Sequence, residues 1–200
     1  MASLRECFTY SDLEWRLAQI PDTAMCRGAF FNKLDDRAAE LSHRTQAEYR
    51  NFFRSTRFVP FRMYAVRDYL TRMAIVSQVT WGARSVYEGM RTLQASAFDA
   101  WAETLIGRAA LAVIDPSLEG VLRMIERAYA SRTLNTHADF RILRIGRNEI
   151  VTRFDNEYLP IEYAMVGALE AVLVLCKTKG AVHAELDSPF AGTVRIRLPH

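Results

Sequence analysis

Apolar residues recur at helical spacing through the first two thirds of the chain. Ser11 can cap a first helix that Pro21 ends, and Pro116 is a start signal for the last helix of this part. The spacing predicts helices over residues 11–20, 23–42, 66–76 and 118–129. Residues 83–114 predict two more helices or one bent helix. The chain from about residue 11 to 135 therefore predicts a layer of helices whose apolar faces meet in a core.

After Thr136 the pattern changes to a period of two, which is typical of strands. A Gly-Arg-Asn turn at residues 146–148 separates two runs rich in Ile, Val, Leu and Phe, which predicts a hairpin of about 138–145 and 149–155. A second hairpin is predicted over residues 182–198, where apolar residues alternate with charged ones. This second hairpin should have one apolar face and one charged face.

Residues 160–176 lie between the two hairpins and are nearly all apolar. Glu162 and Glu170 interrupt the run, and a helix of this length reaches about 25 Å, whereas a membrane span needs roughly 20 apolar residues. We therefore expect a buried helix, with Gly167 allowing it to lie close to the sheet. The predicted fold is α+β in a single domain: an N-terminal helical layer packed on a four-stranded antiparallel sheet, with the order ββαββ over about residues 138–198.

Composition and charge exclude some classes of partner. The chain has 200 residues, half of them apolar, which is enough for a continuous core. Its 26 basic and 23 acidic residues leave a net charge of only +3, so neither nucleic acid nor an acidic membrane is the expected partner. The three cysteines have no paired spacing, and the first residues carry no apolar run of signal-peptide length. We therefore expect a cytoplasmic protein with reduced thiols and no transmembrane segment.

Sequence motifs of catalysis are missing. The chain has no phosphate-binding glycine pattern, no nucleophile elbow and no HExxH, and its four histidines are too far apart for local metal-ligand spacing. We predict no catalytic residues, no metal site and no cofactor, and hence a protein that is not an enzyme. An enzyme remains a third possibility, if Glu170, His137 and Asp139 converge in the fold.

The densest local charge lies in residues 49–67, where arginines alternate with aromatic residues and no acid intervenes. The candidates for an anion-binding or partner-binding patch are Arg50, Arg54, Arg57 and Arg62. Such a segment can hold phosphate or anionic lipid. The alternative, which we favour, is that the aromatic rings fill a core while the arginines are solvated or pair with acids elsewhere.

Three more residues have both a functional and a structural interpretation. Glu170, within the most apolar helix, is either a proton-linked site or a paired structural acid, and we favour pairing. Cys176 has two chemical interpretations, an acylation site or a haem thiolate, and one structural interpretation, a small apolar residue. His183 is either a metal ligand or part of an exposed cross-strand charge network with Glu185 and Arg195, and we favour the network.

Several segments in order carry a resemblance to a known family. They are Arg27-Gly-Ala-Phe-Phe31, Tyr64-Ala-Val-Arg-Asp-Tyr-Leu70, Ala97-Phe-Asp-Ala-Trp101, Leu105-Ile-Gly-Arg108, Arg127-Ala-Tyr129, and the helix with Tyr163 and Gly167-Ala-Leu-Glu170. Over about residues 23–198 the sequence resembles a family of uncharacterised proteins of about this length, expanded in myxobacteria and known mainly as a domain of unknown function. That family is similar in turn to haem nitric-oxide-binding domains, four-vinyl-reductase domains and TRAPP subunits.

The resemblance implies a sensor or a scaffold that binds haem, a small apolar ligand, an acyl chain or another protein. The haem-binding relatives use a Tyr-x-Ser-x-Arg clamp for the propionates, which residues 129–132 approach with the arginine one position early. Their iron ligand is an upstream histidine on a helix, and the only upstream histidine here, His43, is too far back to match. We therefore expect that the protein does not bind haem through such a clamp and histidine ligand.

Our leading hypothesis is a non-enzymatic regulatory or sensor module that binds a small apolar ligand or a protein partner. The residues we expect to contact a ligand lie beside the apolar helix: Tyr163, Val166, Gly167, Glu170 and Tyr129. The alternative is a homo-oligomeric scaffold for protein interaction that binds no ligand, and a homo-oligomer is expected in either case.

Overall fold

The helices of the first part of the chain lie where the apolar spacing predicts them, with one exception. The computed structural model describes residues 11–41, 53, 57–103, 112, 117–129 and 133–199. Its helices in this part are α2 (Ser11–Gln19), α3 (Gly28–Leu41), α5 (Val66–Trp81), α6 (Val86–Glu103) and α8 (Leu118–Ala128). Ser117 caps α8, since its hydroxyl accepts a hydrogen bond from the backbone N–H of Gly120. Much of the predicted stretch 104–114 lies outside the described residues.

The prediction of a helix over residues 23–42 is wrong at its start. Met25–Arg27 form strand β1, which pairs antiparallel with β2 (Met63–Ala65) on one side and with β3 (Thr133–Leu134) on the other. The helix α3 begins only at Gly28, where a Cβ atom would lie 2.4 Å from the carbonyl oxygen of Val59. Strands this short give no alternation to detect, and their partners are remote in sequence, so the pattern missed the whole small sheet.

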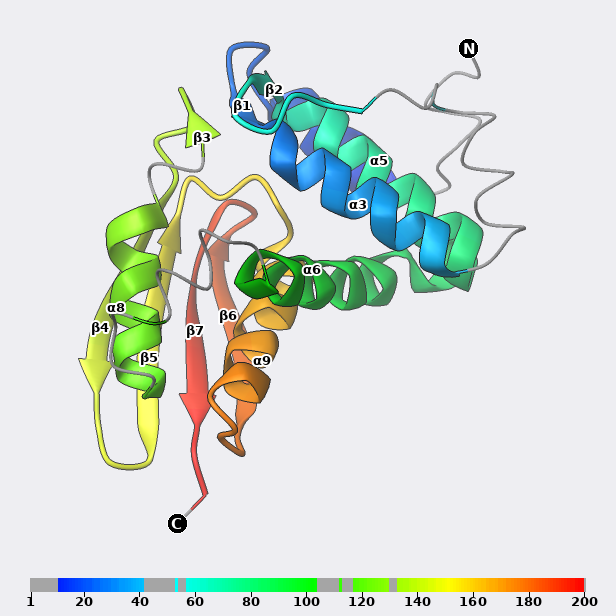
Figure 1. The fold of residues 1–200 in the computed structure, drawn as a ribbon. Helices are drawn as coiled ribbons and strands as arrows, with labels where there is room; N and C mark the ends of the chain where they lie inside the picture. The colour runs from blue at the N-terminus through cyan, green and yellow to red at the C-terminus, as the bar shows by residue number, and fades with distance from the viewer. Residues whose placement is uncertain are drawn as a thin grey trace.

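Both predicted hairpins are confirmed, and they form one sheet. The strands are β4 (Asp139–Ile145), β5 (Glu149–Asp155), β6 (Ala181–Ser188) and β7 (Ala191–Arg197), antiparallel in the order β4-β5-β7-β6. One face is buried and carries Phe140, Phe154, Val194 and Ile196. Figure 1 shows two helices lying over the same face of the sheet. They are α8 and the helix between the two hairpins, α9 (Val166–Leu175).

The apolar helix between the hairpins is buried, as predicted. It opens with a wide π-helical turn, Ile161–Met165, because three successive backbone N–H groups share the carbonyl oxygen of Pro160, and it continues as α9. Of the described helical residues in it, only Val174 is strongly exposed, at 73%. The structure is therefore the predicted α+β fold, with a helical layer and a ββαββ C-terminal part. None of the helices within the described ranges is long and apolar enough to cross a membrane.

The role predicted for Gly167 needs correction. A Cβ atom at Gly167 would lie 2.1 Å from the carbonyl oxygen of Arg91, so the close approach is to α6 and not to the sheet. Helix α9 is therefore held between the sheet on one side and α6 on the other (Figure 1). We call this contact, made by Gly167 and Glu170 of α9 with Arg91 of α6 and by Tyr163 with Tyr87, the α6–α9 crossing.

The other face of the sheet carries the expected charge network. Arg195 lies 3.3 Å from Glu185 and 3.8 Å from Glu149 on neighbouring strands. Arg153 pairs with Asp155 and with Asp187. The Arg153 guanidinium, helped by Arg141, lowers the pKa of Asp155. His183 is exposed on this face, which agrees with the network interpretation.

Candidate ligand site

The residues predicted to contact a ligand beside α9 are mostly engaged with other parts of the protein. Tyr163 stacks on Tyr87, with ring centroids 4.9 Å apart. Glu170 accepts two hydrogen bonds from the Arg91 guanidinium, one of them 2.9 Å long from Nε, and this pairing raises the pKa of Arg91. Glu170 is therefore a paired structural acid, as favoured. Val166 is buried in the core.

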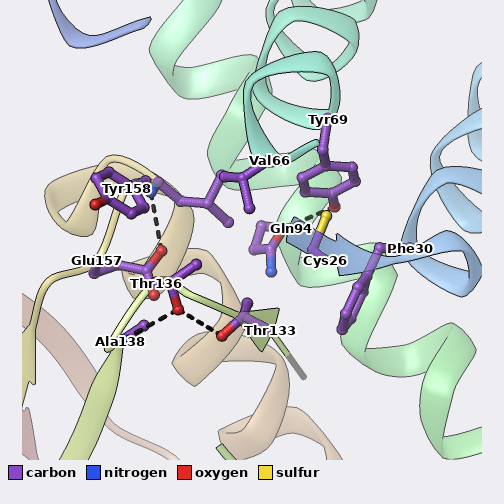
Figure 2. Close-up of a pocket in the computed structure, with 11 residues that line it drawn as sticks. Cys26, Phe30, Val66, Tyr69, Gln94, Thr133, Thr136, Ala138, Glu157 and Tyr158 are labelled. Carbon is purple, nitrogen blue, oxygen red and sulfur yellow. Dashed lines mark hydrogen bonds between the residues drawn. The ribbon is translucent and has the colours of Figure 1, made fainter. Parts of the chain in front are cut away.

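A cavity of about 30 Å³ lies elsewhere, where the helical part meets the loops that flank the four-stranded sheet (Figure 2). Its lining comes from β1, α3, α5, α6, β3 and the segments before β4 and after β5. The lining residues are Cys26, Phe30, Val66, Tyr69, Gln94, Thr133, Thr136, Ala138, Glu157, Tyr158 and Leu159. We call it the junction cavity. The five residues predicted as ligand contacts do not line it, and that role for them stays a prediction.

Polar groups converge on the junction cavity from both parts of the chain. The Gln94 side chain on α6 is 8% exposed, and its Oε1 accepts a hydrogen bond from the hydroxyl of Tyr69 on α5, at 3.4 Å. Across the cavity the hydroxyls of Thr133 and Thr136 lie 2.7 Å apart, and the Thr136 hydroxyl also accepts from the backbone N–H of Ala138. Amide and hydroxyl groups thus face each other across the cavity.

Glu157 brings a buried carboxyl group to the same place. It is 3% exposed, its Oε1 accepts from the backbone N–H of Leu159 at 2.9 Å, and its Oε2 accepts a short hydrogen bond from the Tyr129 hydroxyl. Tyr129, one of the predicted ligand residues, therefore reaches the cavity through Glu157. The neighbouring Tyr158 has a raised pKa because it is partly buried, so its phenol stays protonated at neutral pH.

The backbone around these groups is strained. Of the described non-glycine residues, four have positive φ, and three of those four flank the cavity: Asn135 (57°), His137 (52°) and Asn156 (52°). Asn135 and His137 enclose Thr136, while Asn156 directly precedes Glu157. The Asn156 side-chain amide donates to the His137 carbonyl at 3.1 Å, which ties the two segments together. A left-handed conformation costs about 1–2 kcal/mol for most L-residues, so the surrounding fold holds these loops in place.

Sequence reasoning missed Gln94, Thr136 and Glu157. No two of them are close in the sequence, and each residue type is common on solvated surfaces. The one available signal is the pair of asparagines at 135 and 156, because asparagine adopts the left-handed region more readily than most residues. That signal marks a turn and does not identify what the turn presents.

The arginine-rich segment is structural where the structure describes it. Phe58 and Tyr64 pack around Phe31, and the guanidinium of Arg72, on α5, lies 4.9 Å from the Phe58 ring centroid. Arg67 donates to the carbonyl oxygens of Leu17 and Ile20 at the end of α2. The interpretation that the rings fill a core therefore holds for Phe58 and Tyr64, whereas Phe61 is 68% exposed. Of the four patch candidates, Arg57 and Arg62 are exposed, and Arg50 and Arg54 lie outside the described residues.

The other residues with a possible chemical role are placed apart. Burial raises the pKa of the Cys176 thiol, which keeps it neutral rather than a reactive thiolate. Asp139 pairs with Arg141, and His137 is exposed at the rim of its loop. Within the described part of the chain no three His, Cys, Asp or Glu side chains gather in a way that suits a metal ion.

The architecture matches that of H-NOX proteins, the haem nitric-oxide-binding domains. An H-NOX protein from S. oneidensis, in the Fe(II)NO ligation state, superposes with a TM-score of 0.67 at 12% identity, covering 87% of this chain and 99% of that one. A mutant of T. tengcongensis H-NOX gives 0.67 at 14% identity, with 87% and 98% covered. The Fe(II) unliganded H-NOX protein from K. algicida gives 0.65 at 12% identity, with 87% and 97% covered. At these identities the likeness establishes the fold alone.

The family is established by sequence. The model of the family described as "Protein of unknown function (DUF2378)" matches residues 19–197, which is nearly the whole chain, so the chain belongs to that family. A search of curated proteins gives no match. The expected membership of a family of unknown function, distantly similar to haem nitric-oxide-binding domains, is confirmed.

Proposed function

We propose that this protein is a non-enzymatic regulatory module that binds a small molecule in the junction cavity, on an H-NOX-like fold that does not use haem. The observation that carries the proposal is the convergence of Gln94, Thr136 and Glu157, all more than nine-tenths buried, on one cavity between the two parts of the chain. Buried polar groups and strained backbone cost free energy, and such features cluster at binding sites.

The residues around this site do not fit haem. Pockets for drug-sized ligands measure about 300–1,000 Å³, whereas the junction cavity measures about 30 Å³. Helix α6 contains no histidine, and the described histidines His137 and His183 are exposed, away from the cavity interior. The Tyr129 hydroxyl, which opens the incomplete clamp motif, donates to the Glu157 carboxylate. A carboxylate at that position repels the propionate that the motif would hold.

The same geometry supports a role without catalysis. The three residues that an enzyme would need to bring together are placed differently: Glu170 pairs with Arg91, Asp139 pairs with Arg141, and His137 is exposed. Within the cavity, both oxygens of Glu157 already accept hydrogen bonds from the protein. These contacts favour a group that holds a ligand in place over one that transfers a proton.

The test is a ligand search on full-length protein purified from its own host. Native mass spectrometry should show a non-covalent adduct of constant mass, which denaturing extraction releases. Thr136→Val should reduce the occupied fraction at least tenfold, while Thr193→Val, on the outer face of the sheet, should leave it unchanged. An adduct insensitive to Thr136→Val, or its absence from host-purified protein, would overturn the cavity as the site. Stoichiometric haem with its Soret absorbance would overturn the haem-independent role.

A homo-oligomeric scaffold is the second candidate function. It is favoured by the exposed apolar side chains Val59 (56%) and Phe61 (68%), which precede β2, an outer strand of the small sheet. Light scattering should then give at least twice the chain mass of 22.9 kDa, and Phe61→Ser should return the protein to monomer. A monomeric mass at micromolar concentration contradicts this candidate.

A further inference from the structure

The Gln94 side-chain amide lines the junction cavity, and no described residue bonds to its nitrogen. Gln94 is 8% exposed, and its only hydrogen bond with the described residues is the one from Tyr69 to Oε1. Figure 2 shows its nitrogen directed away from Tyr69, toward the side of the cavity where Thr133 and Thr136 lie. Exchanging the oxygen and nitrogen of this amide leaves one of them unsatisfied in either orientation. The atom without a partner therefore faces the cavity, where a ligand can form a hydrogen bond with it.

The threonine pair adds one more donor. Thr133 and Thr136 have two hydroxyl hydrogens, and their mutual hydrogen bond at 2.7 Å uses one of them. The backbone N–H of Ala138 occupies an acceptor position of Thr136, not its hydrogen. One hydroxyl hydrogen therefore remains to be donated. With the two N–H groups of Gln94, the cavity offers donors that suit an oxygen acceptor on a ligand.

Glu157 sets the opposite requirement. Its carboxyl group is fixed by Tyr129 and by the backbone of Leu159, and it lies in the lining of the same cavity. A buried carboxylate accepts an N–H or O–H from a ligand and repels an anion, because the low dielectric of the interior strengthens both effects. A ligand group that fits must therefore accept and donate at once without carrying negative charge.

Size and apolar walls complete the description. About 30 Å³ has room for two or three heavy atoms, since a single water needs about 10–15 Å³. Phe30, Val66 and Leu159 supply apolar surface beside the polar groups. A small apolar body can rest on these side chains while only its polar end fills the cavity.

We infer that the ligand of this site carries a neutral group that both donates and accepts hydrogen bonds, namely a carboxamide or a hydroxyl. The group accepts from Gln94 and the threonine pair and donates to Glu157. This inference rests on the proposed function, because it names the chemistry of the same site. It extends that proposal by excluding carboxylates and phosphates from the ligand class.

The experiment compares two small probes of nearly equal shape, acetamide and acetate, on the full-length protein. Ligand-efficiency limits set the best dissociation constant for a probe of four heavy atoms at about 0.04 mM, so weak binding is expected and NMR is the appropriate readout. Acetamide should shift the Gln94 side-chain amide resonances in a saturable way. Acetate should bind at least tenfold more weakly.

Variants separate the site from non-specific effects. Gln94→Met keeps the length of the side chain and should weaken acetamide binding at least tenfold. Gln78→Met is the control: Gln78 lies on α5 outside the cavity lining and also has a buried amide oxygen without a partner, yet acetamide binding should be unchanged. Circular dichroism verifies that both variants fold. If Gln94→Met does not fold, Thr136→Ser, which keeps the hydroxyl, and Thr136→Val, which removes it, provide the same comparison.

The outcomes distinguish this inference from the function it rests on. Equal binding of acetate and acetamide overturns the neutral class, while the cavity remains a site. A native adduct sensitive to Thr136→Val, with no shift by acetamide at any cavity residue, overturns the carboxamide or hydroxyl chemistry and leaves the proposed function standing. Absence of both the adduct and the shift overturns both proposals.

Discussion

The helical part of the chain meets the C-terminal part at two places that are built in opposite ways. At the α6–α9 crossing, Gly167 lets one helix lie against the carbonyl oxygen of Arg91, and no room is left for a side chain. At the junction cavity the contact is hollow, polar and bounded by left-handed residues such as His137. One contact is therefore built for stability, and the other keeps empty space and polar groups that stability alone would eliminate.

Filling the close approach at Gly167 should destabilise the protein more than any other change proposed below. Gly167→Ala places a methyl group where the Arg91 backbone already lies, and overpacking of this kind costs about 3 kcal/mol because backbone cannot move aside. For a chain of this length that loss lowers the Tm by roughly 6–12 °C. Urea and thermal unfolding measure it, with Gly146→Ala as the milder comparison, since a Cβ there would lie 3.3 Å from the Glu149 carbonyl oxygen and requires a shift of only a few tenths of an ångström. Equal stability of the two variants would show that the crossing is not tightly packed.

The next effect concerns the strained side of the comparison. His137→Gly should stabilise the protein by about 0.5–1 kcal/mol, because glycine adopts the left-handed conformation without the steric cost. Lys177→Gly is the control, with φ of 50° at the end of α9, and should stabilise by a similar amount. Only His137→Gly should weaken acetamide binding, since it loosens the loop that presents Thr136. Equal binding by both variants would mean that the strain does not position the site.

A smaller effect is expected for the ion pair at the crossing. The side chains of Arg91 and Glu170 are 34% and 37% exposed, so solvent screens their attraction. A double-mutant cycle with Arg91→Met and Glu170→Gln should give a coupling of about 0.5–1 kcal/mol, which decreases in about 1 M salt. A coupling of several kcal/mol would place the stability of the crossing in its charges and not in the packing at Gly167.

The smallest effect lies on the outer face of the sheet, away from both contacts. The Arg153 guanidinium, with Arg141, lowers the pKa of Asp155 below its usual 3.8, so the folded state binds the proton less tightly than the unfolded state. This stabilisation is fully present above the unfolded pKa and is lost as the pH falls through the folded pKa. Asp155→Asn should therefore cost a few tenths of a kcal/mol at pH 7 and nothing in strong acid. Urea midpoints across pH measure it, and a cost that persists in acid would contradict the charge origin.

The sequence predicts the well-packed contact far better than the hollow one. The helix over residues 160–176 and the two hairpins are long segments with a clear apolar pattern. That pattern identifies which of their faces are buried, and the tertiary contacts agree with it. Gly167 could also be recognised as a close approach, although the neighbour is α6 and not the sheet. The pairing of Glu170 is expected for an acid within an apolar helix, although the sequence does not identify Arg91 as its partner.

The junction cavity could not be predicted because it depends on non-local contacts. Gln94 is a single polar residue on a helix and looks like a surface position until the small sheet covers it. Thr136 and Glu157 are directed toward the cavity by neighbouring left-handed residues. These residues lie on both sides of Thr136 and directly before Glu157. Short strands and single left-handed residues leave almost no periodic signal, so the pattern predicts the framework and not the space inside it.

The small sheet also sets an order of events during folding. Strand β1 needs β2, some forty residues later, and β3, more than a hundred residues later, before both of its edges are paired. Contacts of such high sequence separation form slowly because the intervening loops must close first. During synthesis on the ribosome, a nascent chain that ends before Thr133 has one edge of β1 still open and lacks part of the wall of the junction cavity. The junction cavity is therefore completed late, after the third strand has emerged and docked.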